Sequence, residues 1–153
     1  MQPTLPTESF IAAALAELAR DTLNLLEAAQ QQKPLDKEEI GFWRRQYNGF
    51  NKAEYQWHQG VRPLPTEDGW LIPSASQPGS QVHRAIRHGG VWVCSCRAGE
   101  LNQFHWHTAL LAAIERGGEL ESLAEDAAEL RISQSIAAAR GRLLHELDAA
   151  YAA

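Results

Sequence analysis

Four side chains that can bind a metal ion stand close together in the second half of the chain. Cys94 and Cys96 form a C-x-C pair, and after a gap of eight residues His105 and His107 form an H-x-H pair. A disulfide between Cys94 and Cys96 would be strained and would close almost no loop, so we expect free thiols. Two short Cys and His pairs are typical ligands of tetrahedral zinc sites. The spacing therefore predicts one bound zinc ion.

The ligand types indicate a structural rather than a catalytic zinc. Two thiolates and two neutral imidazoles balance the ion's charge, and four protein ligands leave no position at which zinc could activate water. The sequence also lacks the H-E-x-x-H, phosphate-loop and nucleophile-elbow signatures. We therefore predict a binding protein that is not an enzyme. Two alternatives stay open: the four residues are unrelated core side chains, or His58 or Glu54 serves an open metal site.

The stretch around these residues resembles the SWIM zinc finger. That family has C-x-C, a variable gap and then C-x-H, on a short hairpin followed by a helix. Cys94, Cys96 and His107 match three of the four ligands, and the resemblance extends over residues 69–116. It implies zinc as the cofactor and DNA binding or protein contacts as the function, in recombination, repair or mobile elements.

One predicted ligand departs from the family pattern. His105 stands where the family has its third cysteine. Histidine keeps the number of ligands, but its longer side chain must shift the backbone or the ion. His83, His88 and His58 are the alternative donors for this position.

The charge distribution is compatible with a nucleic-acid partner, DNA in the first place. The chain carries −5 in total, whereas residues 41–107 carry +3 and the remainder −8. A charge of +3 is weak beside that of dedicated nucleic-acid-binding proteins. The residues that we predict to contact nucleic acid are Arg84, Arg87, Arg97, Arg44, Arg45 and Lys52.

The alternative function is a protein-interaction adaptor in which zinc only stabilises a small fold. The two ends of the chain are rich in Ala and Leu and are acidic, which favours a protein partner or self-association through terminal helices. No stretch is long and apolar enough for a membrane span, and no signal-peptide pattern is present. We expect no membrane partner and a cytoplasmic location.

Helical periodicity predicts most of the chain outside the middle. One helix is expected at residues 9–32, and a second begins after Asp36, with Glu39 completing a capping box, and can break at residues 48–49. Trp43, Tyr47 and Phe50 share a helical spacing that is typical of core residues. Further helices are expected at residues 104–115 and 120–150, separated by the glycines at 117–118.

The middle of the chain has the pattern of short strands. Residues 69–72, 81–87 and 91–93 are expected to be strands, with a tight turn at residues 88–90. Arg84 and Arg87 would then lie on opposite faces of one strand. The predicted fold class is α+β: a small antiparallel hairpin or three-stranded sheet with a zinc site, flanked by N- and C-terminal helices. The predicted domains are a helical region (1–59), a SWIM-like module (60–118) and a C-terminal helix (119–153).

Overall fold

The computed structural model of the protein describes residues 3–77 and 79–152. The fold is α+β, as predicted, and the chain divides into two compact units, Met1–Gly118 and Glu119–Ala153. The elements follow one another as α1 (Glu8–Gln32), α2 (Lys37–His58), β1 (Leu64–Pro65), β2 (Gly69–Pro73), β3 (Val82–His88), β4 (Val91–Cys94), α3 (Arg97–Glu100) and α4 (Trp106–Ala152).

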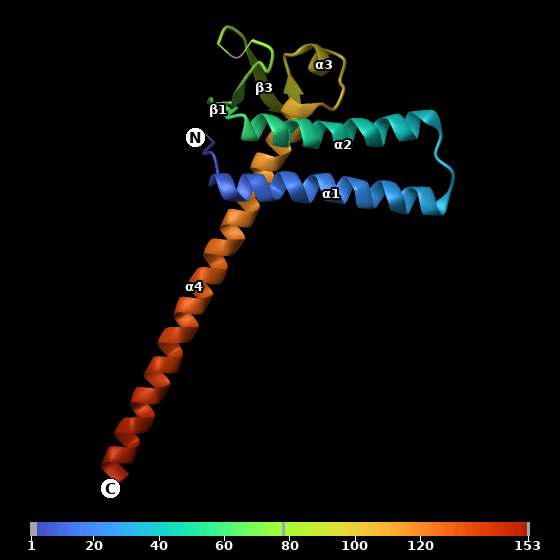
Figure 1. Ribbon diagram of the computed structural model, residues 1–153. Helices are drawn as coiled ribbons and strands as arrows, with labels where there is room; N and C mark the ends of the chain where they lie inside the picture. The colour runs from blue at the N-terminus through green and yellow to red at the C-terminus, as the bar shows by residue number, and fades with distance from the viewer. Residues whose placement is uncertain (1–2, 78, 153) are drawn as a thin grey trace. The chain divides into compact units, whose positions relative to one another are not determined.

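The helices α1 and α2 form an antiparallel pair that runs side by side (Figure 1). The predicted capping box is present at the start of α2, where the Asp36 side chain accepts from Glu39 N at 2.9 Å and the Glu39 carboxylate accepts from Asp36 N at 3.0 Å. α2 continues without a break through Asn48 and Gly49. Gly49 is buried against Phe104, whose ring would lie 2.6 Å from an added Cβ atom, so glycine here permits close packing.

The strands form a four-stranded antiparallel sheet in the order β1-β2-β3-β4. The two strands of the β3–β4 hairpin are joined at Gly89 and Gly90, whose φ angles are +58° and +81°. Two successive positive φ angles are typical of a type I′ turn, whose twist matches that of the strands. The sheet has one strand more than the predicted maximum. β1 is only two residues long and ends in proline, so it has no alternation by which the sequence could reveal it.

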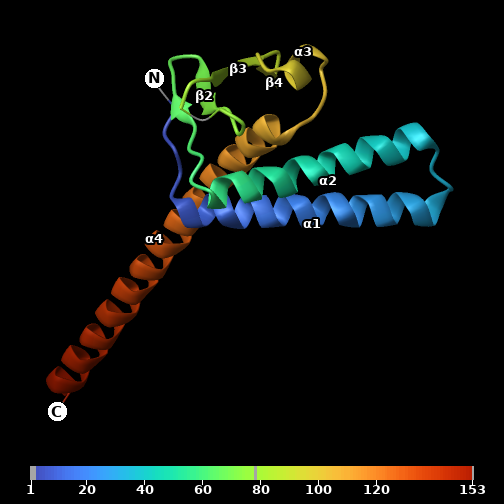
Figure 2. The same cartoon turned by 45° about the horizontal axis from the view of Figure 1, so that its top comes forward.

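The first turns of α4 supply a large part of the core of the first unit. Leu110 and Leu111 are fully buried there with Ile11 and Leu15 of α1 and Ile72 of β2. In the two views of Figures 1 and 2, α2 and this start of α4 lie between the sheet and α1. Burying apolar side chains from helices and sheet together is what holds these layers in contact.

The predicted helices at residues 104–115 and 120–150 are one helix, α4, and the expected break at residues 117–118 does not occur. A glycine inside a helix costs about 1 kcal/mol relative to alanine. Gly117 is buried, and an added Cβ would lie 3.2 Å from the Cα of Ile11, so this glycine lets α1 and α4 approach closely. The packing of the two helices therefore offsets the low helix propensity.

The second unit consists of the remainder of α4. Every residue from 122 to 152 is exposed, including the large apolar side chains Leu130, Ile136 and Leu144. Among the described residues, no helix is long and apolar enough to cross a membrane.

Candidate metal centre

The four predicted ligands come from three consecutive pieces of the fold. Cys94 ends β4, and Cys96 is the residue that caps the short helix α3. His105 lies in the loop before α4, and His107 is the second residue of that helix. The hairpin and the helix start thus bring together two pairs of donors that are separated by eight residues in the sequence.

The ligand atoms of these residues converge on one point. One donor atom from each of the four side chains can be chosen so that all four lie within 4.8 Å of one another. Cys94 Sγ lies 3.4 Å from His107 Nδ1, and Cys96 Sγ lies 2.9 Å from His105 Nε2. The two imidazole nitrogens are 3.2 Å apart. The cluster can hold a metal ion, and Cys94, Cys96 and His107 are buried in it while His105 is half-buried.

A tight turn after the first cysteine wraps the backbone around the cluster. Gly99 N–H donates to Cys96 Sγ at 3.4 Å. An added Cβ on Gly99 would lie only 2.0 Å from the carbonyl oxygen of Cys94 and 2.9 Å from its Cβ. The residue at 99 must therefore be glycine for the amide to reach the sulfur. Amide donors to sulfur stabilise its thiolate form and orient it.

The loop after α3 orients His105. Asn102 adopts a left-handed φ of +50°, which asparagine tolerates better than most residues, and this turns the chain back toward the cluster. The carbonyl oxygen of Gln103 then lies 2.8 Å from His105 Nδ1. Because a carbonyl can only accept, Nδ1 carries the proton and donates, which leaves the lone pair of Nε2 directed at the cluster. The Thr108 hydroxyl donates to the His105 carbonyl at 2.9 Å.

His107 is held by burial and by neighbouring rings. Its ring centroid is 4.1 Å from that of Trp106 and 4.9 Å from that of His83. Its Nε2 atom is buried and has no hydrogen-bond partner in the described part of the chain. His83, one of the alternative donors, therefore lies beside a ligand, but it does not belong to the cluster of four, and neither does His88 or His58.

Burial favours the neutral form of Cys94, His105 and His107 in the metal-free cluster. It raises the pKa of Cys94 to about 12. It lowers the pKa of His107 to about 3, with the nearby charges of His105, His83 and Lys52 acting in the same direction. Burial also lowers the pKa of His105. A divalent cation reverses this preference for the thiols, because a metal ion favours deprotonated ligands.

The six predicted nucleic-acid-binding residues fall into two groups. Arg84, Arg87 and Arg97 each form an ion pair with a carboxylate, from Asp68, Glu115 and Glu100 respectively. The other three, which all lie on α2, form no ion pair within the described ranges: Arg44, Arg45 and Lys52. Of these six cations, those without an ion pair in the described part of the chain therefore lie on α2.

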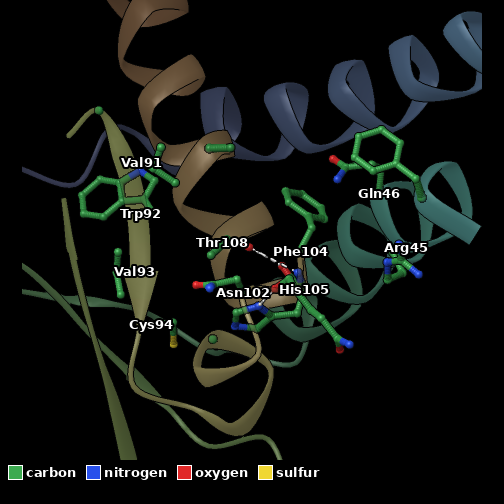
Figure 3. A pocket seen from close by; sticks show the side chains of 15 residues that line it. Arg45, Gln46, Val91, Trp92, Val93, Cys94, Asn102, Phe104, His105 and Thr108 are labelled. Atoms are coloured by element: carbon green, nitrogen blue, oxygen red, sulfur yellow. Dashed lines mark hydrogen bonds between the residues drawn. The ribbon is translucent and has the colours of Figure 1, made fainter. Parts of the chain in front are cut away.

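A cleft of about 630 Å³ lies beside the cluster, between α2, β4 and the start of α4. Figure 3 shows Arg45 and Gln46 of α2 on one side and Val91 and Trp92 of β4 on the other, with Phe104 between them. Cys94 and His105 are part of the wall, so the cleft and the cluster share two residues. Sequence patterns could not reveal this cleft, because its walls come from segments about 50 residues apart in the chain.

Comparison of the chain with models of known protein families, with curated proteins and with solved structures finds no match.

Proposed function

We propose that Cys94, Cys96, His105 and His107 bind one structural zinc ion, and that the protein is a non-enzymatic, SWIM-like zinc-finger module that binds nucleic acid. The observation that carries the zinc proposal is the spacing of the donor atoms. Zinc bonds of 2.3 Å to sulfur and 2.0–2.1 Å to nitrogen give tetrahedral edges of about 3.6 Å between S and N, and of about 3.3 Å between two N atoms. The separations of 3.4 Å between Cys94 Sγ and His107 Nδ1 and of 3.2 Å between the two nitrogens lie close to these edges, whereas the 2.9 Å between Cys96 Sγ and His105 Nε2 is shorter than the S–N edge.

The chemistry of the donors fits the same ion. Two thiolates and two imidazoles make a neutral complex with Zn²⁺, so the buried centre needs no further counter-charge. The four protein donors fill the tetrahedron, and this supports a structural role.

Metal analysis of protein purified without a metal-affinity tag tests the zinc proposal. We expect one zinc per chain, and we expect Cys94→Ser and Cys96→Ser to lose it together with tertiary structure in the first unit. Helical circular dichroism from the second unit should persist in both variants. A folded, metal-free parent protein contradicts the proposal.

The nucleic-acid proposal is supported by the uncompensated cations on α2. Lys52 lies near enough to the cluster for its charge to lower the pKa of His107, so basic residues and the metal centre share one region. DNA is the favoured partner, in repair, recombination or mobile-element activity, by resemblance to SWIM modules. Electrophoretic mobility shifts of DNA and RNA oligonucleotides at increasing salt test this proposal, since phosphate contacts weaken as salt rises. Absence of a shift at low salt would reject it.

A protein-interaction adaptor is the second candidate. It is favoured by the exposed apolar side chains of residues 122–152, because a helix of this length gains most of its stability from packing its apolar face. Analytical ultracentrifugation of the full chain and pull-down from its host separate the adaptor from a nucleic-acid-binding module.

A further inference from the structure

We propose that the cleft between α2, β4 and α4 binds an unpaired base of single-stranded nucleic acid. This rests on the proposed nucleic-acid function and specifies the form of nucleic acid that the protein takes. It follows from the shape of the cleft, the rings in its walls and the charge at its rim.

The walls of the cleft offer surfaces on which a base can stack. Phe42 of α2, Trp92 of β4 and Phe104 of the loop before α4 line it, and Phe42 is 47% exposed although its ring is large and apolar. Phe104 is fixed by contact with Phe50, at 5.3 Å between ring centroids. Stacking on aromatic rings is the main source of affinity for single strands, because every base has a π-face.

The rim of the cleft carries polar groups that suit a base and a phosphate. Gln46 and Asn102 provide amide groups that can both donate to and accept from a base edge. Arg45 lines the same cleft, and it forms no ion pair in the part of the chain that the structure describes. None of the 15 lining residues is acidic, although the chain carries a net charge of −5.

The concave shape of the cleft favours an unpaired base over a duplex. In a double helix each base is stacked and paired, so its faces cannot enter a cleft of this kind without being extruded. The surface cations of α2 could contact the phosphates of either form. A preference for single strands is therefore the property that separates base binding in the cleft from phosphate binding on the surface.

Fluorescence anisotropy with zinc-loaded full-length protein tests the inference with three 12-nucleotide probes: single-stranded DNA, the same strand with abasic sites, and duplex DNA. We expect the single strand to bind at least about tenfold more tightly than the other two, because each base–aromatic stack contributes about 1–3 kcal/mol. The affinity for an RNA strand of the same sequence shows whether the protein distinguishes ribose from deoxyribose. Equal affinity for all three DNA probes overturns the inference but not the nucleic-acid function, whereas no binding to any probe overturns both.

Two pairs of variants locate the site. Phe42→Leu removes a ring of the cleft, and Tyr55→Leu removes an exposed ring of α2 that does not line it. We expect Phe42→Leu to weaken single-strand binding about fivefold or more and Tyr55→Leu to leave it unchanged. Arg45→Gln should lower both the affinity for single-stranded DNA and the dependence of that affinity on salt, whereas Arg20→Gln on α1 serves as its control. Equal effects within each pair place the base elsewhere and refute the inference.

Backbone amide shifts in NMR spectra of the parent protein give a readout that needs no variant. Thymidine 5′-monophosphate should shift the amides of Gln46, Val91 to Val93 and Thr108, and leave those of residues 122–152 unchanged. N-acetyltryptophanamide serves as the probe for a protein side chain. If it moves the cleft amides and the nucleotide does not, the cleft binds a protein partner and the inference is wrong.

Discussion

Replacing Gly99 by alanine is the most direct test of how the fold builds the metal centre. The added Cβ would lie 2.0 Å from the carbonyl oxygen and 2.7 Å from the carbonyl carbon of Cys94, and neither atom belongs to a flexible side chain. The backbone must retreat by about 1 Å to reach 3.0 Å, below which such contacts are essentially never found. Metal–ligand bonds tolerate only about 0.2 Å. The variant must therefore displace the Cys94 sulfur or lose the Gly99 amide bond to Cys96.

We expect Gly99→Ala to lower zinc affinity by about 10- to 100-fold, the usual cost of disturbing groups that orient a ligand. Overpacking should also lower the free energy of unfolding by about 1–3 kcal/mol. Competition with a chromophoric chelator measures the affinity, and the visible spectrum of the cobalt-substituted protein reports the tetrahedral ligand field. Gly79→Ala is the matched control, because an added Cβ there meets nothing within 4 Å. If Gly99→Ala retains the parent affinity and cobalt spectrum, the turn does not support the site as described.

Three further predictions follow from the same geometry. His105→Ala should weaken zinc binding without abolishing it, whereas His105→Cys should restore or exceed the parent affinity because it adds a third thiolate. Competition with a chelator measures the affinity. Identical affinity in the parent and both variants would show that His105 is not a ligand. Zinc affinity should fall as pH falls, because zinc binds the two cysteines as thiolates. Calorimetry near pH 7 in buffers of different ionisation enthalpy should detect the release of about two protons when zinc binds. An affinity that does not depend on pH would contradict thiolate ligation. Gly118→Ala should raise the melting temperature, because alanine gains about 1 kcal/mol of helix propensity and its Cβ meets only an ordinary 3.6 Å contact with Pro6. Gly117→Ala should stabilise the protein less or destabilise it, because its Cβ would lie tightly against Ile11. Equal gains in melting temperature would show that α1 and α4 do not pack closely there.

The features predictable from sequence are those with a local signature. The capping box at Asp36, the glycine turn of the β3–β4 hairpin and the periodicity of α1 each depend on residues a few positions apart. The grouping of the Cys and His pairs is similarly local, because only a hairpin end and a helix start are needed to bring them together. Local rules gave a wrong prediction at Gly117, where the low helix propensity of glycine is outweighed by contact with Ile11, a residue more than 100 positions earlier.

Which arginines are free to contact a phosphate is hard to predict from sequence, because it depends on distant carboxylates. Arg84 and Arg87 have the same side chain as Arg45, yet they pair with Asp68 and Glu115, which lie 16 and 28 positions away in the chain. No pattern within a strand reveals such partners. Only the folded chain distinguishes a compensated arginine from one that can meet a phosphate.

The geometry of His105 explains how a histidine can serve at the position where the SWIM pattern has a cysteine. The two histidines offer different nitrogens to the cluster: His107 uses Nδ1, close to its backbone, and His105 uses the remote Nε2. Because Nε2 lies farther from the backbone than a cysteine sulfur does, the backbone at residue 105 must lie farther from a bound ion than the backbone of a cysteine ligand would. The left-handed turn at Asn102 and the bond from His105 Nδ1 to the Gln103 carbonyl hold it at that distance. The loop before α4 therefore sets the position of His105, while the hairpin and the start of α4 set those of the cysteines and His107.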